Sequence, residues 1–96
     1  MEFIKTPGRI YAENSEGQMI AEVTFPLDSE GVVAIDHTYV ADELRGQGVA
    51  DKLMEETYEL LKTENLRAKP VCSYAVAWYK RHPEKNDIVI AREIDE

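Results

Sequence analysis

The heptapeptide LRGQGVA, residues 44–50, stands where the hydrophobic pattern of the chain changes. Before it, residues 32–40 begin apolar on both faces, which is typical of a central strand. After it, an apolar stripe recurs at helical spacing while charged residues face away, which predicts an amphipathic helix. The stripe comprises Val49, Leu53, Thr57, Leu60 and Leu61. A strand that leads through two glycines into a helix decides the fold.

The same loop is suited to holding phosphates. Gly46 and Gly48 let the backbone approach a ligand, several N–H groups converge there, and the helix start adds partial positive charge. The loop either grips a pyrophosphate or is only a tight turn, since short motifs are weak by themselves. A nucleotide P-loop fits poorly because no lysine follows Gly48, and the dinucleotide fingerprint fits poorly because its third glycine is missing.

Toward the N-terminus, polar turn signals separate short apolar segments. The turns are expected at residues 6–8, 14–17 and 28–31. Apolar and polar residues alternate over residues 19–25, as they do in a strand with one buried face. Residues 1–40 therefore predict a three-stranded antiparallel meander that ends in the strand at residues 32–40.

Toward the C-terminus, we expect the long helix to stop at Asn65 and residues 70–72 to form a buried strand. Ser73 is the predicted N-cap of a second helix over residues 74–81, and residues 88–90 predict a last strand. The fold class is therefore α/β with a mixed sheet (α+β). An antiparallel meander precedes a β-α-β unit with parallel strands and a short second helix.

Composition bounds the class of protein. The chain has 96 residues, enough for one core, so residues 1–96 are expected to form a single domain. A formal net charge of −8 argues against nucleic-acid binding, and no apolar run is long enough to span a bilayer. The one cysteine, Cys72, fits a reducing compartment, so we expect a cytoplasmic protein.

Two segments at the right separation resemble the GNAT superfamily of acetyltransferases. Its acetyl-CoA loop reads Arg/Gln-x-x-Gly-x-Gly/Ala, and Arg45, Gly48 and Ala50 stand at the defined positions. Residues 77–81 resemble the Ala-x-x-aromatic-Tyr-x-Lys region of a later GNAT helix. Residues 36–40 and 72–75, with the loop, are similar to the small single-domain group of about 100 residues. The resemblance covers roughly residues 31–90.

This resemblance implies acetyl-CoA as cofactor. The backbone amides of the loop would hold the pyrophosphate, and the strand before it would contact the pantetheine arm. The loop residues are Arg45, Gly46, Gln47, Gly48, Val49 and Ala50, and the strand residues are Thr38, Tyr39 and Val40. Lys80 either touches the adenosine phosphates or belongs to a solvated face. Larger GNAT enzymes carry helices between their first two strands, where we expect only residues 14–17, so the acceptor site is abbreviated, open or built by a partner.

Three residues are candidates for the chemistry, each with an alternative. His37 is a base for the amine or a hydrogen-bonded strand histidine. Tyr79 matches the family position of the acid that protonates the leaving thiolate, or it is packing. Cys72 either accepts acetyl covalently or is a small buried residue. No metal-ligand spacing is present. His82, at a helix end before Pro83, is either a helix cap, which the pattern favours, or a catalytic residue.

The predicted function is acetyl-CoA-dependent N-acetyl transfer, by direct attack of an amine or through Cys72. The acceptor would be a small-molecule amine or a protein lysine, and an acidic surface favours a cationic one. The alternatives are a module that binds acetyl-CoA or CoA without transfer, and a structural protein whose glycine loop is only a turn. A monomer is compatible with the sequence, which does not determine the oligomeric state.

Overall fold

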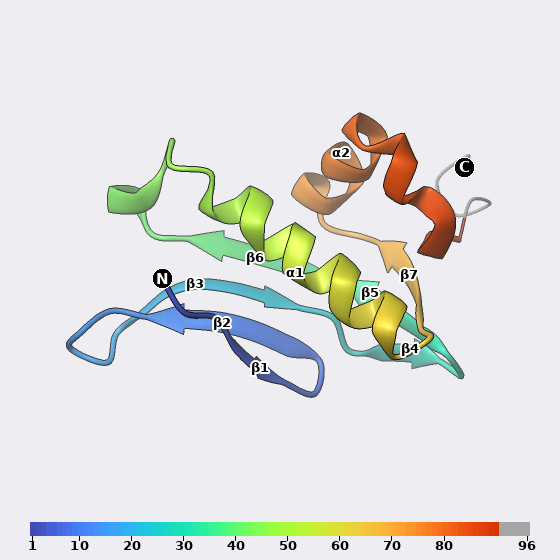
Figure 1. Ribbon diagram of the computed structural model, residues 1–96, viewed down its shortest axis with the longest axis horizontal. Coiled ribbons are helices and arrows are strands. Elements are labelled where there is room, and N and C mark those ends of the chain that lie inside the picture. The colour runs from blue at the N-terminus through green and yellow to red at the C-terminus, as the bar shows by residue number, and fades with distance from the viewer. Residues whose placement is uncertain (91–96) are drawn as a thin grey trace.

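The computed structural model describes residues 1–90, in which seven strands form two small sheets (Figure 1). Strands β1 (Ile4–Thr6), β2 (Arg9–Glu13), β3 (Met19–Thr24) and β6 (His37–Val40) form an antiparallel sheet in that order. Strands β4 (Leu27–Ser29), β5 (Val32–Ile35) and β7 (Arg67–Pro70) form the second sheet, in which β5 and β7 are parallel. The predicted mixed α+β class is confirmed.

The predicted strand at residues 32–40 is broken at Asp36, which is a correction. Its first half, β5, lies between β4 and β7, whereas its second half, β6, pairs with β3. The Asp36 N–H donates to the carbonyl of Thr24, and the Thr24 hydroxyl donates to the Asp36 carboxylate. These contacts hold the bend, so β6 and β7 belong to different sheets.

Helix α1 (Val49–Thr63) confirms the amphipathic pattern and covers the antiparallel sheet (Figure 1). Leu53, Met54 and Leu61 are fully buried, together with Ala21 and Val23 of β3. Asn65 follows the helix with a φ of 61°, the left-handed conformation that commonly ends helices. In residues 1–90 no helix is long and apolar enough to cross a membrane.

The C-terminal third needs three corrections. Strand β7 ends at Pro70, because the N–H groups of Val71 and Cys72 both donate to the Ile35 carbonyl and turn the chain. Helix α2 (Ser73–Arg81) is capped by Cys72 rather than Ser73. The predicted strand at residues 88–90 is replaced by the 3-10 helix η2 (Pro83–Ile88) and a single bridge between Ala68 and Val89.

The N-terminal part contains more strands than the predicted meander. Strand β1 precedes it, and β4 forms before the turn at Gly31. Pro7 and Gly8 therefore join the first two strands, whereas residues 14–18 join the second and third. The prediction that residues 14–17 separate the first two strands is wrong, but both connections in the described chain are short turns.

Candidate functional site

The predicted phosphate loop is an open turn at the start of α1. Gly46 and Gly48 have φ values of 82° and 76°, the left-handed region that glycine tolerates best. A Cβ built on either glycine meets no atom within 4 Å, so internal packing does not require these glycines. Gly48 is the N-cap without a side-chain hydrogen bond, which leaves the first N–H groups of the helix to a ligand. The loop fits an anionic group.

A groove of 320 Å³ connects this loop to β6 and α2. Thr38 and Val40 line it from β6, and Tyr74 lines it from α2. The remaining lining residues are Leu44, Arg45, Gly46, Gly48, Val49, Ala50 and Asp51. The structure thus brings together most of the residues that the sequence assigned to the cofactor.

Three of the predicted cofactor residues are not among those that line the groove. Tyr39 pairs with Glu22 in the sheet register, which places its side chain on the opposite face from Thr38 and Val40. The side-chain amide of Gln47 donates to the carbonyl of Glu43, and Lys80 is exposed on α2. Tyr39 and Gln47 remain candidates only through their backbone groups.

The sequence interpretation missed Tyr74, Asp51 and Leu44. Tyr74 lies two residues after the Cys72 cap, so recognising the cap would have placed its side chain at the start of α2 beside the loop. Burial raises the pKa of the Tyr74 hydroxyl, and Arg81 opposes that shift. Tyr74 therefore lines the groove with a half-buried side chain, and its hydroxyl keeps its proton at neutral pH.

Cys72 lies where β6 and α2 face each other. Its Sγ accepts a hydrogen bond of 3.4 Å from the N–H of Ala75 and lies 3.4 Å from Oγ1 of Thr38. The side chain is half-buried, so neither interpretation of the sequence is excluded. The sulfur is held at a helix N-terminus, where negative charge is favoured.

Tyr79 points into the protein core. It is fully buried, and its hydroxyl has no hydrogen-bond partner among residues 1–90. Burial, with Tyr58 and Asp87 nearby, raises the pKa of this hydroxyl well above its usual range. The structure does not bring Tyr79 to the groove, and its role as acid stays a prediction.

A polar cluster fastens the second half of α2 to the start of α1. The Trp78 indole donates to the Asp51 carboxylate over 2.6 Å, and His82 stacks on Trp78 with ring centroids 4.1 Å apart. His82 Nδ1 lies 2.8 Å from the Trp78 carbonyl, in keeping with a helix-end role. Since Asp51 also lines the groove, this cluster fixes one wall of it.

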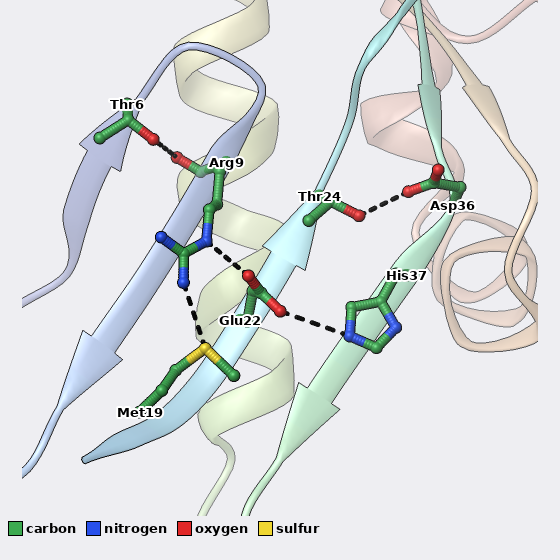
Figure 2. Close-up of polar contacts among 7 residues, drawn as sticks. All are labelled: Thr6, Arg9, Met19, Glu22, Thr24, Asp36 and His37. Atoms are coloured by element: carbon green, nitrogen blue, oxygen red, sulfur yellow. Dashed lines mark hydrogen bonds and ion pairs between the residues drawn. The ribbon is translucent and has the colours of Figure 1, made fainter.

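His37 lies on the other face of the antiparallel sheet (Figure 2). Its Nε2 is 3.4 Å from Oε1 of Glu22, and Oε2 of the same carboxylate accepts from Arg9. The hydrogen bond with Glu22 raises the pKa of Arg9, so this guanidinium is always charged. Side chains alternate along β6, so His37 and the groove residue Thr38 lie on opposite sides of one strand.

A larger hollow of 530 Å³ lies at the other end of α1. It is lined by the turn at Pro7 and Gly8 and by Phe25, Leu60 and Leu66, among others. None of the predicted site residues borders it, so the smaller groove is the better candidate.

Comparisons with known proteins identify the family and the fold. Residues 9–88 match the model of the family described as GCN5-related N-acetyl-transferase. The chain is similar to a GCN5-like protein of Staphylococcus aureus, with 30% identity and a TM-score of 0.78 over 93% of this chain and 87% of that one. No curated protein sequence matched.

Larger enzymes share the fold. An IAA acetyltransferase of Bacillus cereus is 20% identical with a TM-score of 0.60, covering 76% of this chain and 51% of its own. A ribosomal-protein-alanine N-acetyltransferase of Brucella melitensis is 19% identical with a TM-score of 0.56, covering 76% and 59%. The chain therefore spans only 51% and 59% of the length of these two enzymes.

Proposed function

The chain belongs to the GCN5-related N-acetyltransferase family, and from that premise we propose that it transfers an acetyl group from acetyl-CoA to a primary amine. One observation carries the proposal. The groove joins an anion-binding loop with two left-handed glycines to Thr38 and Tyr74, and Thr38 also contacts Cys72. The loop proposed to hold the phosphates therefore lines the same groove as Thr38, whose hydroxyl lies 3.4 Å from the Cys72 sulfur.

The loop and β6 would hold the donor. The N–H groups of Gly46 and of residues 48–50 would face the pyrophosphate, whereas those of Arg45 and Gln47 donate to the carbonyls of Asp42 and Leu44. Arg45 adds a cation that is now paired with Asp42 at 3.2 Å. Strand β6 pairs with β3 on one side only among residues 1–90, so its other edge is available to a pantetheine amide. Bound acetyl-CoA supplies a thioester carbonyl to an attacking amine.

The protein would supply a base and an acid. His37 is the proposed base, which removes a proton from the acceptor's ammonium. Tyr79 is the acid that family resemblance favours, but Tyr74 is the tyrosine whose side chain lines the groove. We therefore propose Tyr74, in addition to Tyr79, as a candidate acid that protonates the leaving thiolate.

Transfer through Cys72 is the mechanistic variant. The Cys72 thiolate would attack the carbonyl carbon, a new C–S bond would form, and the CoA sulfur would leave and take a proton. An amine would then release the acetyl group from Cys72. Replacement Cys72→Ser preserves the cap acceptor, so full turnover of Cys72→Ser and Cys72→Ala would eliminate this variant.

The acceptor is proposed to be a small-molecule amine or a protein lysine, in the cytoplasm. The net charge of −8 favours a cationic acceptor, and the single cysteine is compatible with a reducing compartment. A screen of amines with acetyl-CoA, with release of free thiol as readout, is the direct test of catalysis.

The donor site is tested by amide NMR titration with acetyl-CoA, using free CoA and NAD as controls. Saturable shifts at residues 45–50 and 72–75 with acetyl-CoA and CoA, but not with NAD, are expected. An unchanged spectrum at millimolar acetyl-CoA would overturn the proposed function.

A second candidate is a module that binds acetyl-CoA without transfer. The buried Tyr79 hydroxyl and the short turns in place of helices in residues 1–30 favour it. Saturable acetyl-CoA binding with no thiol release across the amine screen would select this alternative.

A further inference from the structure

The face of β2, β3 and β6 that points away from α1 carries an ordered row of aromatic and charged side chains. The strand register places Tyr11, Glu22 and Tyr39 side by side across the three strands. Arg9 and His37 occupy the next row on the same face, on either side of Thr24. Glu22 lies between these partners, with 15% of its side chain exposed.

One half of this face already holds a cation. The Arg9 guanidinium lies 3.7 Å from the centroid of the Tyr11 ring. It also donates to Oε2 of Glu22 (Figure 2). An aromatic face combined with a carboxylate is a recurring way of binding cations. Arg9 shows that the geometry of this sheet face allows it.

The other half has a similar composition but is open. Tyr39 flanks Glu22 on β6 and is 40% exposed. Oε1 of Glu22 faces His37, and the exposed Asp36 adds a second carboxylate next to it (Figure 2). Of these groups, the Glu22 carboxylate lies within ion-pair distance of the exposed imidazole. The Tyr39 ring belongs to the same sheet face, and the Asp36 carboxylate accepts from Thr24.

We propose that this open half receives the acceptor as a primary alkylammonium, and that Glu22 is the positioning residue for His37. The inference rests on the proposed acetyl transfer. Oε1 of Glu22 lies 3.4 Å from Nε2, and a carboxylate at that distance favours the proton on Nε2, so that the neutral ring would carry its lone pair on Nδ1. The acceptor's N–H bond breaks, its proton forms a new bond to Nδ1, and the electron pair stays on the amine nitrogen.

The proposed acceptor site lies across strand β6 from the groove that is proposed to hold acetyl-CoA. Thr38 faces the groove and contacts Cys72, while its neighbour His37 faces the acceptor. Only strand β6 separates the two sides, and its edge toward α2 pairs with no strand in the described chain. The freed amine is therefore one strand away from the expected thioester.

The experiment is an amide NMR titration of the full chain. If acetyl-CoA binds, it is added to saturation before the probes. The probes are Nα-acetyl-lysine amide and n-butylamine, and the neutral control is Nα-acetyl-norleucine amide. Either charged probe, but not the neutral one, is expected to shift His37, Tyr39 and Glu22. Shifts of equal size with n-butylamine and with the lysine amide would indicate that the acceptor is a free alkylamine. A response to the lysine amide alone would indicate that the acceptor is a protein lysine.

The variant Glu22→Gln tests the positioning role. At a pH where the His37 ring is neutral, its 15N spectrum is expected to change from mainly the Nε2–H tautomer to a mixture of tautomers, and probe affinity to fall about tenfold. Glu59→Gln, on the exposed face of α1, is the control and should change neither. If Glu22→Gln does not fold, Tyr39→Leu provides the second test, with an expected weakening of about 2–5-fold.

The outcomes separate the two proposals. Acetyl-CoA shifts at residues 45–50 without any probe shifts at His37 and Tyr39 would overturn this inference and leave the proposed function intact. An unchanged His37 tautomer in Glu22→Gln would overturn the positioning role. No response to acetyl-CoA would overturn the proposed function itself.

Discussion

The two ends of α2 differ in what surrounds them. At the N-terminal end, Cys72 and Tyr74 are half-buried beside the groove. At the C-terminal end, Trp78 and Tyr79 are fully buried, and Trp78 is hydrogen-bonded to Asp51 of α1. One short helix therefore has an open end suited to ligand contact and a packed end that holds it in place.

This difference indicates a division of labour. The packed end fixes the position of α2 through the core, while the open end presents side chains to the groove. Substitutions at the packed end should change stability, and substitutions at the open end or the facing loop should change binding or turnover. The following predictions test that separation.

The largest effect is expected for Trp78→Ala. Removing a fully buried indole and its hydrogen bond to Asp51 should cost about 3–5 kcal/mol of unfolding free energy. Chemical denaturation measures the loss. Trp78→Phe keeps most of the side-chain volume but not the hydrogen-bond donor, so its unfolding free energy should fall less than that of Trp78→Ala. A Trp78→Ala protein of wild-type stability would contradict the packed-end interpretation.

Gly48→Val should mainly weaken ligand binding by the glycine loop at residues 45–50. A β-branched residue at a φ of 76° is strained by about 1–2 kcal/mol and places its side chain where the phosphate is expected. Acetyl-CoA affinity, measured by calorimetry, should fall at least about tenfold. Gly17→Val is the matched control, because Gly17 has a φ of 80° and equally open surroundings in a remote turn. Equal affinity losses in both variants would refute the loop's role.

The tyrosine pair gives the sharpest comparison. Tyr79→Phe removes a hydroxyl that has no partner among residues 1–90, so stability should change by less than about 1 kcal/mol. Turnover should be kept in Tyr79→Phe and reduced in Tyr74→Phe, as measured by thiol release with an active amine. The reverse result, with both proteins folded, would assign the acid role to Tyr79 and break the comparison.

The smallest effect concerns pH near the packed end. Hydrogen bonds from Lys62 and then Tyr58 lower the pKa of Asp87. A lowered native pKa stabilises the fold above the unfolded value of about 4, and this contribution is lost as pH falls through the native pKa. Asp87→Asn should therefore flatten the acid limb of stability below about pH 4. Acetyl-CoA affinity at neutral pH should not change. If the unfolding free energy of the variant fell with pH as steeply as that of the wild type, the stabilising role of the Asp87 contacts with Lys62 and Tyr58 would be contradicted.

Several features were predictable because they depend on neighbours in the chain. The apolar stripe from Val49 predicted α1, and Asn65 marked its end. The two glycines predicted the open loop, since a left-handed backbone is a local requirement. The family resemblance depended on the same short segments and was confirmed.

Other features depend on contacts between distant segments. Cys72 became the cap of α2 because Val71 and Cys72 both bond to the Ile35 carbonyl, far earlier in the chain. Tyr79 is buried because α2 packs on α1 through Trp78 and Asp51. Periodicity over nine helical residues did not distinguish the face toward the groove from the face toward the core.

The sequence by itself determined the two helices, the glycine loop and the family, because hydrophobic period and glycine conformation are local properties. Only the tertiary structure decided that the strand at residues 32–40 breaks at Asp36 and that the side chains of His37 and Thr38 lie on opposite faces of the sheet. It also decided that Tyr74 rather than Tyr79 lines the groove. Those outcomes follow from strand pairing and helix packing between distant residues, whose energies exceed local preferences.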